Sequence, residues 1–191
     1  MASEALQVVI GLGANIGRPQ VQLERAVLAL AGVGLVDGVS GLYRSSAIGG
    51  PAQPDFLNAA VLVRTDRSLS DLLIALLAME RLAGRERRER WGPRPLDLDI
   101  LWAQGMRLRS VRLEVPHPRL LERAFALLPL IEVAPHAVDP WSGTPYSDCI
   151  SPSVVRQECR CVAGWMAGIW VPAVSGCSHR RGPLPGEALR G

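Results

Sequence analysis

Residues 84–102 read G-R-E-R-R-E-R-W-G-P-R-P-L-D-L-D-I-L-W. The first part, residues 84–95, is a charged loop with five arginines and a Trp-Gly-Pro turn, which can continue neither a helix nor a central strand. In the second part, residues 96–102, apolar and acidic side chains largely alternate, and this period of two is typical of a half-buried strand. The stretch therefore predicts a loop that leads into a strand of a sheet.

The residues before this stretch predict an α+β fold. Residues 6–12 and 56–65 are apolar, as in buried strands, and residues 35–44 are strand-like with interruptions by small residues. Apolar residues at helical spacing predict one helix that opens at Pro19 and a second over residues 69–83. The order strand, helix, strand, strand, helix, strand is that of a ferredoxin-like α/β sandwich, a βαββαβ core with helices packed on an antiparallel sheet.

The residues after this stretch show weaker patterns. Residues 106–115 predict a short hairpin, and residues 120–133 predict one or two helical pieces interrupted by Pro129. The chain then becomes rich in Ser, Pro, Gly and Arg without sustained periodicity. We therefore predict a folded domain over residues 1–148 and a disordered C-terminal extension over residues 149–191.

The composition is that of a globular protein with a mild charge. Of the 191 residues, 48% are hydrophobic and 20% are charged, and the net charge is +3. Every basic side chain is arginine, which a GC-rich genome would explain, so the arginine count alone does not indicate phosphate binding. We predict no nucleic-acid partner and no membrane association, because the charge is small and no apolar run reaches about 20 residues. The first residues lack the pattern of a secretory signal, so we expect a cytoplasmic protein, and all four cysteines follow residue 148, which excludes a disulfide framework for the domain.

Asp97 and Asp99 are candidate metal ligands. They lie two residues apart on the predicted strand, so both side chains leave the same face, roughly 6.6 Å apart. At an effective dielectric of about 20, two like charges at this distance repel by about 2.5 kcal/mol. Mg²⁺ would relieve the repulsion, since it is commonly held by one or two carboxylates and completed by water and phosphate. The pattern alone also fits two acids on the solvated face of an edge strand.

The neighbouring arginines favour the metal and phosphate interpretation. A polyphosphate held between metal ions and guanidinium groups is a recurring arrangement in phosphoryl transfer. The alternative is a solvated loop in which Glu86 and Glu89 neutralise the arginines.

Several ring and amide side chains could form a site for a flat heterocycle. Phe56, Trp91 and Phe125 offer rings for stacking, and Asn58 offers an amide that can read donors and acceptors. His117, between two prolines, suits a fixed hydrogen bond to phosphate. Each of these aromatic residues, taken singly, is more often part of a core, and such a histidine is more often a surface residue.

Two other patterns are weak. Residues 11–17 resemble a dinucleotide fingerprint, but the third glycine is one residue late and no βαβαβ run follows. The pairs Cys159-x-Cys161 and Cys177-x-His179 offer zinc ligands without the usual spacing. We therefore expect neither a dinucleotide site nor a zinc site.

Five separated motifs carry a resemblance to a known family. They are G-A-N at residues 13–15, D-F-L-N-A-A at 55–60, R-W-G-P-R-x-L-D-L-D-I at 90–100, V-P-H-P at 115–118 and R-A-F at 123–125. In this order and spacing, the sequence resembles 6-hydroxymethyl-7,8-dihydropterin pyrophosphokinase of folate biosynthesis over residues 8–139.

The resemblance implies an enzyme with a ferredoxin-like fold that moves pyrophosphate from ATP to the hydroxymethyl group of 6-hydroxymethyl-7,8-dihydropterin and releases AMP. It implies two Mg²⁺ ions held by Asp97 and Asp99, and we expect a monomer with ATP and hydroxymethyldihydropterin as its partners. The catalytic residues would be Arg85, Arg94, Asp97 and Asp99; the ATP-binding residues would be Glu80, Arg87, Ile100, His117 and Arg123; and the pterin pocket would contain Ser45, Ser46, Ile48, Phe56, Asn58, Trp91 and Phe125.

Two other classes of protein are weighed against this enzyme. An inactive nucleotide-binding relative would keep the fold, although it would have little reason to keep both Asp97 and Asp99. An RNA-binding ferredoxin-like module would need several exposed aromatics on its sheet and a wide basic face, which Tyr43 and Phe56 alone do not provide.

Overall fold

The structure, a computed structural model, describes residues 5–85 and 92–172. Its strands are β1 (Leu6–Ala14), β2 (Leu35–Val39), β3 (Leu42–Ser45), β4 (Phe56–Thr65), β5 (Asp97–Ala103), β6 (Leu108–Arg109), β7 (Glu114–Val115), β8 (Cys159–Met166) and β9 (Ile169–Pro172). Its α-helices are α1 (Pro19–Leu30), α2 (Leu69–Leu82), α3 (Ala124–Val133) and α4 (Pro152–Val155), and two 3₁₀ turns are η1 (Leu120–Glu122) and η2 (Tyr146–Cys149).

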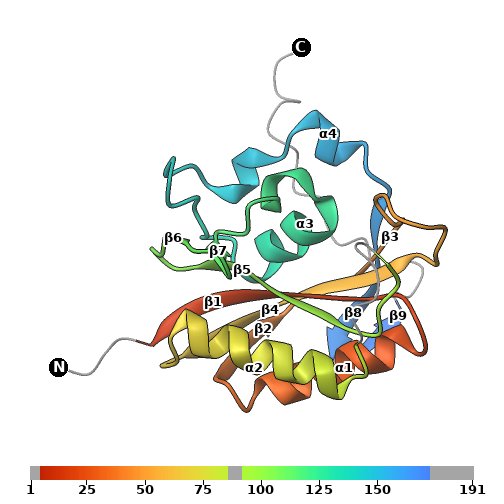
Figure 1. Ribbon diagram of the computed structural model, residues 1–191. Coiled ribbons are helices and arrows are strands. Elements are labelled where there is room, and N and C mark those ends of the chain that lie inside the picture. Colours follow the sequence, from red (N-terminus) through yellow and green to blue (C-terminus); the bar gives the residue numbers. More distant parts are fainter. Residues whose placement is uncertain (1–4, 86–91, 173–191) are drawn as a thin grey trace, which may run out of the picture.

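A large antiparallel sheet forms the centre of the molecule (Figure 1). Its strands follow the order β5-β1-β4-β3-β8-β9, and β2 pairs with the part of β4 that β3 leaves open. β1 and β4 pair along their whole length, from Leu6↔Thr65 to Ala14↔Leu57. With β2 and β3 counted as one interrupted edge strand, the order of elements and of strands confirms the ferredoxin-like prediction.

Helices cover both faces of the sheet. In Figure 1, α1 and α2 lie below the sheet and α3 lies above it. Because side chains alternate along a strand, β1 supplies both cores: Val8, Ile10 and Leu12 pack with α1 and α2, whereas Val9 packs with α3. The face toward α3 also carries the site described below.

The predicted helices and strands of the first two thirds of the chain are found within about two residues of their expected ends. Helix α2 begins after Ser68, whose Oγ accepts a hydrogen bond from Asp71 N at 3.1 Å and so caps the helix. It ends before Gly84, whose φ of +83° suits a helix stop. With 14 residues α2 is the longest helix described, and no helix in this part of the chain is long and apolar enough to cross a membrane.

The predicted break at Pro129 is wrong. Pro129 lies buried inside α3, and the break between helical pieces falls at Arg123, which has extended dihedral angles of φ −121° and ψ 104°. A proline removes one helical hydrogen bond, but burial of an apolar helix on a sheet outweighs that loss.

The disorder predicted for the C-terminal extension is wrong for its described part, residues 149–172. β8 pairs with β3 from Leu42↔Ala163 to Ser45↔Cys159, and β9 completes a hairpin. Trp170 on β9 is 2% exposed. The local composition did not indicate this hairpin, because the residues that bury it belong to β3 and α1, far away in sequence. The domain boundary at residue 148 stays a prediction, and residues 173–191 lie outside the described residues.

Candidate active site

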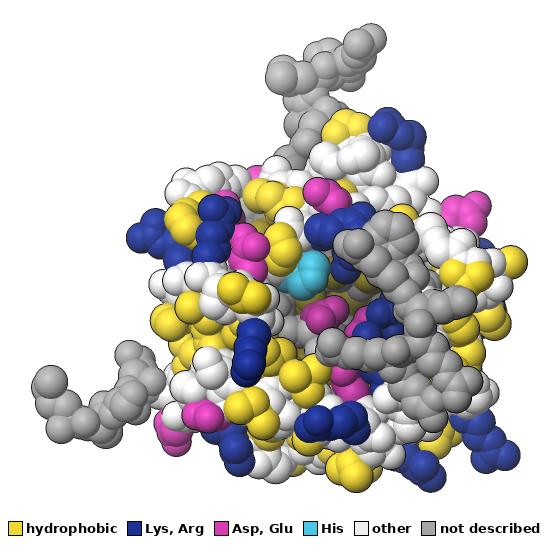
Figure 2. Space-filling view, viewed as in Figure 1, with side chains coloured by type: hydrophobic (Ala, Val, Ile, Leu, Met, Phe, Trp, Pro, Cys, Tyr) yellow, Lys and Arg dark blue, Asp and Glu magenta, His cyan; other side chains and the backbone are white. Residues whose placement is uncertain are grey.

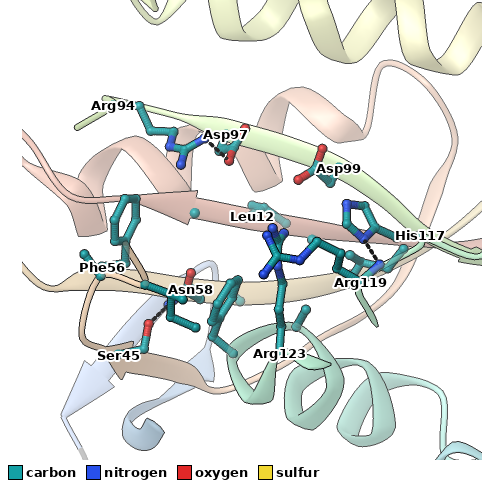
Figure 3. A pocket seen from close by; sticks show the side chains of 18 of the residues that line it. Leu12, Ser45, Phe56, Asn58, Arg94, Asp97, Asp99, His117, Arg119 and Arg123 are labelled. Atoms are coloured by element: carbon teal, nitrogen blue, oxygen red, sulfur yellow. Dashed lines mark hydrogen bonds and ion pairs between the residues drawn. The ribbon is translucent and has the colours of Figure 1, made fainter. Parts of the chain in front are cut away.

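A cleft of about 290 Å³ opens on the α3 side of the sheet. Figure 2 shows a hollow on this face with acidic and basic side chains around it, and Figure 3 shows its lining, which comes from β1, β4, β5 and the start of α3. The residues that line it are Gly11, Leu12, Gly13, Ser45, Ser46, Ala47, Ile48, Gln53, Phe56, Asn58, Ala59, Arg85, Arg94, Asp97, Asp99, Leu101, His117, Arg119, Arg123, Phe125 and Ala126.

Two glycines of β1 lie opposite the two acids of β5. The register pairs Gly13 with Asp97 and Gly11 with Asp99. A Cβ atom on Gly11 would lie 3.0 Å from the side chain of Leu101, and one on Gly13 would lie 3.4 Å from Asn58 Oδ1. The glycines therefore keep the floor of the cleft open beside the carboxyl groups.

Asp97 is held by two guanidinium groups. Arg94 Nη1 lies 2.8 Å from Asp97 Oδ2, and Arg85 Nη1 pairs with Asp97 Oδ1. Arg85 also pairs with Glu80 Oε1, which accepts a hydrogen bond from Leu98 N at 2.8 Å. Burial raises the pKa of the Glu80 carboxyl group, and the hydrogen bond from Leu98 N and the charge of Arg85 act in the opposite direction. The four groups form one network that fixes the start of β5 against the end of α2.

Asp99 has different surroundings. Within the described part of the chain it makes no ion pair, and burial together with the charges of Asp97 and Glu80 raises its pKa to about 7. A carboxyl group in such surroundings gains from a cation beside it. Asp97 and Asp99 together are the residues that could hold a divalent metal.

The donor set fits Mg²⁺ better than zinc. Mg²⁺ needs only one or two protein carboxylates when phosphate and water supply its other ligands. No group of three or more His, Cys, Asp or Glu side chains within residues 5–85 and 92–172 could hold a metal ion, and structural zinc sites commonly need four such ligands. Cys177 and His179 lie outside the described residues.

The basic side of the cleft faces the acids. Figure 3 shows Arg123 at the start of α3 pointing toward the strand that carries Asp97 and Asp99, with Arg119 and His117 beside it. Burial lowers the pKa of Arg123, and the charge of Arg119 lowers it further, whereas the two acids raise it. The cleft therefore concentrates positive charge within a partly desolvated space, as a polyanion site requires.

His117 is a neutral hydrogen-bond donor in this arrangement. Its Nδ1 accepts a hydrogen bond from Arg119 N at 3.1 Å, so in the neutral ring the hydrogen lies on Nε2. Burial and the charge of Arg123 lower the pKa of His117 to about 4, which keeps the ring neutral at physiological pH.

Rings and an amide gather at the other end of the cleft (Figure 3). Asn58 is 4% exposed, and its Nδ2 donates to Ser45 Oγ at 3.0 Å, which fixes the orientation of the amide. The guanidinium of Arg94 lies 5.5 Å from the centroid of the Phe56 ring, and that of Arg123 lies 5.6 Å from the Phe125 ring. This end offers flat apolar surfaces with one oriented amide.

The structure brings most of the predicted site residues to one cleft. Twelve of them line it: Ser45, Ser46, Ile48, Phe56, Asn58, Arg85, Arg94, Asp97, Asp99, His117, Arg123 and Phe125. Glu80 lies next to it and, with Leu77, Arg81 and Arg85, lines an adjoining depression. Ile100 does not line the cleft, because strand alternation turns its side chain into the core between the sheet and helices α1 and α2. Arg87 and Trp91 lie outside the described residues.

Sequence reasoning missed Arg119, Gln53 and Asn15. Arg119 and Gln53 line the cleft. Asn15 is 3% exposed, and its Oδ1 accepts from Arg94 N at 2.8 Å while its Nδ2 donates to Gln53 Oε1 at 2.9 Å and to Pro54 O at 3.1 Å. The signal for Asn15 was its place in the G-A-N motif, but only the tertiary structure shows the three segments that it joins.

Comparisons with known proteins agree with one another. The family described as 7,8-dihydro-6-hydroxymethylpterin-pyrophosphokinase (HPPK) matches residues 9–135. A 2-amino-4-hydroxy-6-hydroxymethyldihydropteridine pyrophosphokinase of Synechocystis sp. is 43% identical over 162 residues, which cover 82% of this chain and 78% of the relative. The protein of the same name from Pseudomonas aeruginosa is 43% identical over 132 residues, which cover 68% of this chain and 81% of the relative.

Larger proteins match over part of their length. A folate synthesis bifunctional protein of Arabidopsis thaliana is 43% identical over 134 residues, which cover 70% of this chain and 24% of the relative. A crystal structure of Plasmodium falciparum HPPK-DHPS A437G with pteroate superposes with a TM-score of 0.66 at 12% identity and covers 90% of this chain and 49% of that chain. The second likeness shows the fold alone. This chain spans half or less of both proteins, so only their matching parts bear on it.

Proposed function

This chain belongs to the 7,8-dihydro-6-hydroxymethylpterin-pyrophosphokinase family, and from that premise we propose how its cleft performs the reaction. The enzyme transfers the β,γ-pyrophosphate of ATP to the hydroxymethyl group of 6-hydroxymethyl-7,8-dihydropterin, giving AMP and the pterin diphosphate in folate biosynthesis. One observation carries the assignment to this cleft: two carboxyl groups, a cluster of arginines and a pair of aromatic rings line the same space.

ATP occupies the basic part of the cleft in this proposal. Arg85, Arg94, Arg123 and the Nε2 hydrogen of His117 donate to phosphate oxygens, and Arg119 joins them because it lines the same space. The base of the nucleotide extends toward the adjoining depression beside Glu80. Arg87 stays a predicted ATP-binding residue outside the described residues.

Asp97 and Asp99 would hold the Mg²⁺ ions that accompany ATP, and two ions are proposed. Bound Mg²⁺ neutralises phosphate charge and orients the phosphates. Both oxygens of Asp97 pair with arginines, so Arg85 or Arg94 must move or share the carboxylate when the metal and phosphates enter. The same movement brings a guanidinium group to the arriving phosphates.

The pterin occupies the aromatic end. Phe56 and Phe125 enclose its rings, and the amide of Asn58, oriented by Ser45, pairs with donors and acceptors on its edge. Ser46 and Ile48 border the same end, and Trp91 stays a predicted member outside the described residues.

The reaction needs positioning and charge stabilisation rather than a protein nucleophile. The hydroxymethyl oxygen of the pterin forms a bond to the β-phosphorus and its O–H proton is released. The bond between this phosphorus and the oxygen bridging it to the α-phosphate breaks, and that oxygen leaves with AMP. Arginine side chains aimed at the phosphates stabilise charge on the transferred group and on the leaving oxygen. The aromatic end keeps the alcohol beside the phosphates and excludes water from it.

The direct test is to incubate the purified protein with ATP, Mg²⁺ and 6-hydroxymethyl-7,8-dihydropterin and to separate the nucleotides. We expect AMP and pterin diphosphate in equal amounts, and no AMP when EDTA removes Mg²⁺. Formation of ADP in place of AMP would contradict pyrophosphoryl transfer.

The predictions of a monomer and of a cytoplasmic location remain proposals. Light scattering after gel filtration tests the first, with one chain of 20.6 kDa as the expected particle. Cell fractionation of the source organism tests the second.

A further inference from the structure

Gln157 lies outside the residues that the family matches, yet its side chain holds the start of α3. We propose that Gln157 is a positioning residue for Arg123, so that the extension after residue 148 takes part in the active site. The inference rests on the proposed role of Arg123 in binding ATP phosphates.

The amide of Gln157 bonds to the backbone on both sides of Arg123. Its Oε1 accepts from Ala124 N at 2.9 Å, and its Nε2 donates to Glu122 O at 2.6 Å. Rotation of Arg123 about its backbone would break one or both of these bonds. Gln157 therefore restrains the peptide groups from which the Arg123 side chain enters the cleft.

The start of α3 has no side-chain cap of its own. Arg123 is the N-cap residue, and its side chain points into the cleft instead of capping the helix. Its carbonyl accepts from Leu127 N at 2.9 Å, so a shift of Arg123 also disturbs the first turn, which carries Phe125. Since an unpaired N–H at a helix start destabilises the turn, the long-range bond from Ala124 to Gln157 replaces a local cap.

Gln157 is itself held in place. It follows α4, whose Val154 is 2% exposed and packs in the same buried cluster as Ala124 and Leu127 of α3. The backbone N–H of Gln157 donates to Val154 O at 3.1 Å, and Cys159 N donates to Gln157 O at 2.8 Å. The side chain thus projects from a short segment anchored at one end by a core residue and at the other by β8.

The same segment reaches the pterin end of the cleft. The first residue of β8, Cys159, pairs with Ser45, and Glu158 Oε2 lies 3.5 Å from Ser46 Oγ. Residues 154–159 therefore connect the proposed phosphate end and the proposed pterin end. This connection explains how a segment without a residue lining the cleft can set its geometry.

The test compares Gln157→Met with Gln20→Met in the full chain. Methionine has a similar length and removes the amide in both places. Gln20 is the matched control, because its Nε2 also makes two hydrogen bonds, to Glu24 Oε1 and to Trp170 O, both at 2.9 Å, on the opposite face of the sheet. Both substitutions remove two hydrogen bonds and are expected to lower the midpoint of thermal unfolding.

The kinetic constants distinguish positioning from stability. We expect Gln157→Met to lower kcat/KM for ATP by roughly 10-fold, as a misplaced binding group does. We expect Gln20→Met to keep the kcat and the KM for ATP of the wild type. Equal constants for Gln157→Met and the wild type would overturn the inference, and so would an equal kinetic loss in both variants.

A double-mutant cycle with Arg123→Met tests the route of the effect. If Gln157 acts through Arg123, Gln157→Met adds no further loss in the Arg123→Met protein, whereas independent effects would multiply and contradict the inference. For the same four proteins, calorimetry measures the affinity for a non-hydrolysable ATP analogue in the presence of Mg²⁺. Because binding of the analogue requires no reaction, this measurement tests the positioning of Arg123 even if the wild type produces no AMP. The absence of AMP would contradict the proposed function and not this inference.

Discussion

Asp97 and Asp99 lie two residues apart on β5, but they affect the stability of the fold in opposite ways: the ion pairs of Asp97 stabilise it, whereas the buried charge of Asp99 destabilises it. Asp97 pairs with Arg85 and Arg94, whereas Asp99 has no such partner in the described part of the chain. Burial raises the pKa of Asp99 from 3.8 to about 7, so ionising it costs free energy in the folded protein, and this cost grows as the pH rises from about 4 to 7.

We expect Asp99→Asn and Asp97→Asn to separate activity from stability. Both should lower kcat by more than about 100-fold, because each removes a proposed metal ligand. At pH 8 without Mg²⁺, Asp99→Asn should raise the free energy of unfolding by roughly 1–3 kcal/mol, since it removes a buried charge. Asp97→Asn should lower it by roughly 1–3 kcal/mol, since it leaves Arg94 without its carboxylate partner and Arg85 with Glu80 alone.

Urea denaturation monitored by circular dichroism measures both changes. A loss of stability in Asp99→Asn equal to that in Asp97→Asn would show that the two acids have similar surroundings, contrary to the structure.

His117 makes the stability of the folded protein depend on pH with the sign opposite to that of Asp99. Its pKa falls from 6.5 in the unfolded chain to about 4 in the folded protein. Between these values the unfolded chain binds the proton and the folded protein does not, so stability decreases as the pH falls below 6.5 and levels off near pH 4.

Replacing His117 by Asn should remove this dependence. The stability of the wild type relative to His117→Asn should fall by about 2 kcal/mol between pH 7 and pH 5. Chemical denaturation at several pH values measures it, and the same substitution at His136, which bonds to Gln7, controls for the loss of an imidazole. A constant difference between wild type and variant across this range would contradict a neutral, buried His117.

At the scale of elements, the β8–β9 hairpin is a structural part of the fold. Trp170 is 2% exposed, packs in the core on the α1 and α2 side, and donates from Nε1 to Ser40 O at 2.9 Å. Gln20 of α1 also donates to Trp170 O. The hairpin thus extends the sheet beyond β3 and closes one end of the core.

We expect Trp170→Ala to lower the free energy of unfolding by about 3–5 kcal/mol, the usual loss for a large buried ring. Trp141→Ala is the matched control, because Trp141 is 53% exposed and should cost less than about 1 kcal/mol. Equal losses measured by urea denaturation would contradict the packing of β9.

The whole molecule is expected to gain stability when the cleft fills. Only the folded protein presents Asp97, Asp99 and the arginines together, so Mg²⁺ with a non-hydrolysable ATP analogue should stabilise it. At a ligand concentration about 100 times Kd the gain is about 2.7 kcal/mol. Thermal unfolding with and without the ligand measures it, and the protein carrying both Asp97→Asn and Asp99→Asn should show little or no shift.

The periodicity of the sequence predicted much of the fold. Strand alternation placed Asp97 and Asp99 on one face, and apolar residues at helical spacing predicted α2 to within one residue of its ends. These features depend on neighbours within a few residues, where backbone hydrogen bonding and side-chain direction are local properties. The same alternation also predicts that the side chain of Ile100 turns away from the acids, as the structure shows.

The tertiary structure decided what depends on distant partners. The sequence by itself determined the order of elements, the two acids and the family motifs that surround them. It did not determine that both oxygens of Asp97 pair with arginines, that Asn15 joins three segments, or that Gln157 holds the start of α3. The physical reason is that a hydrogen bond or a buried side chain between remote segments forms only when the rest of the chain brings them together, and no local pattern records that pairing.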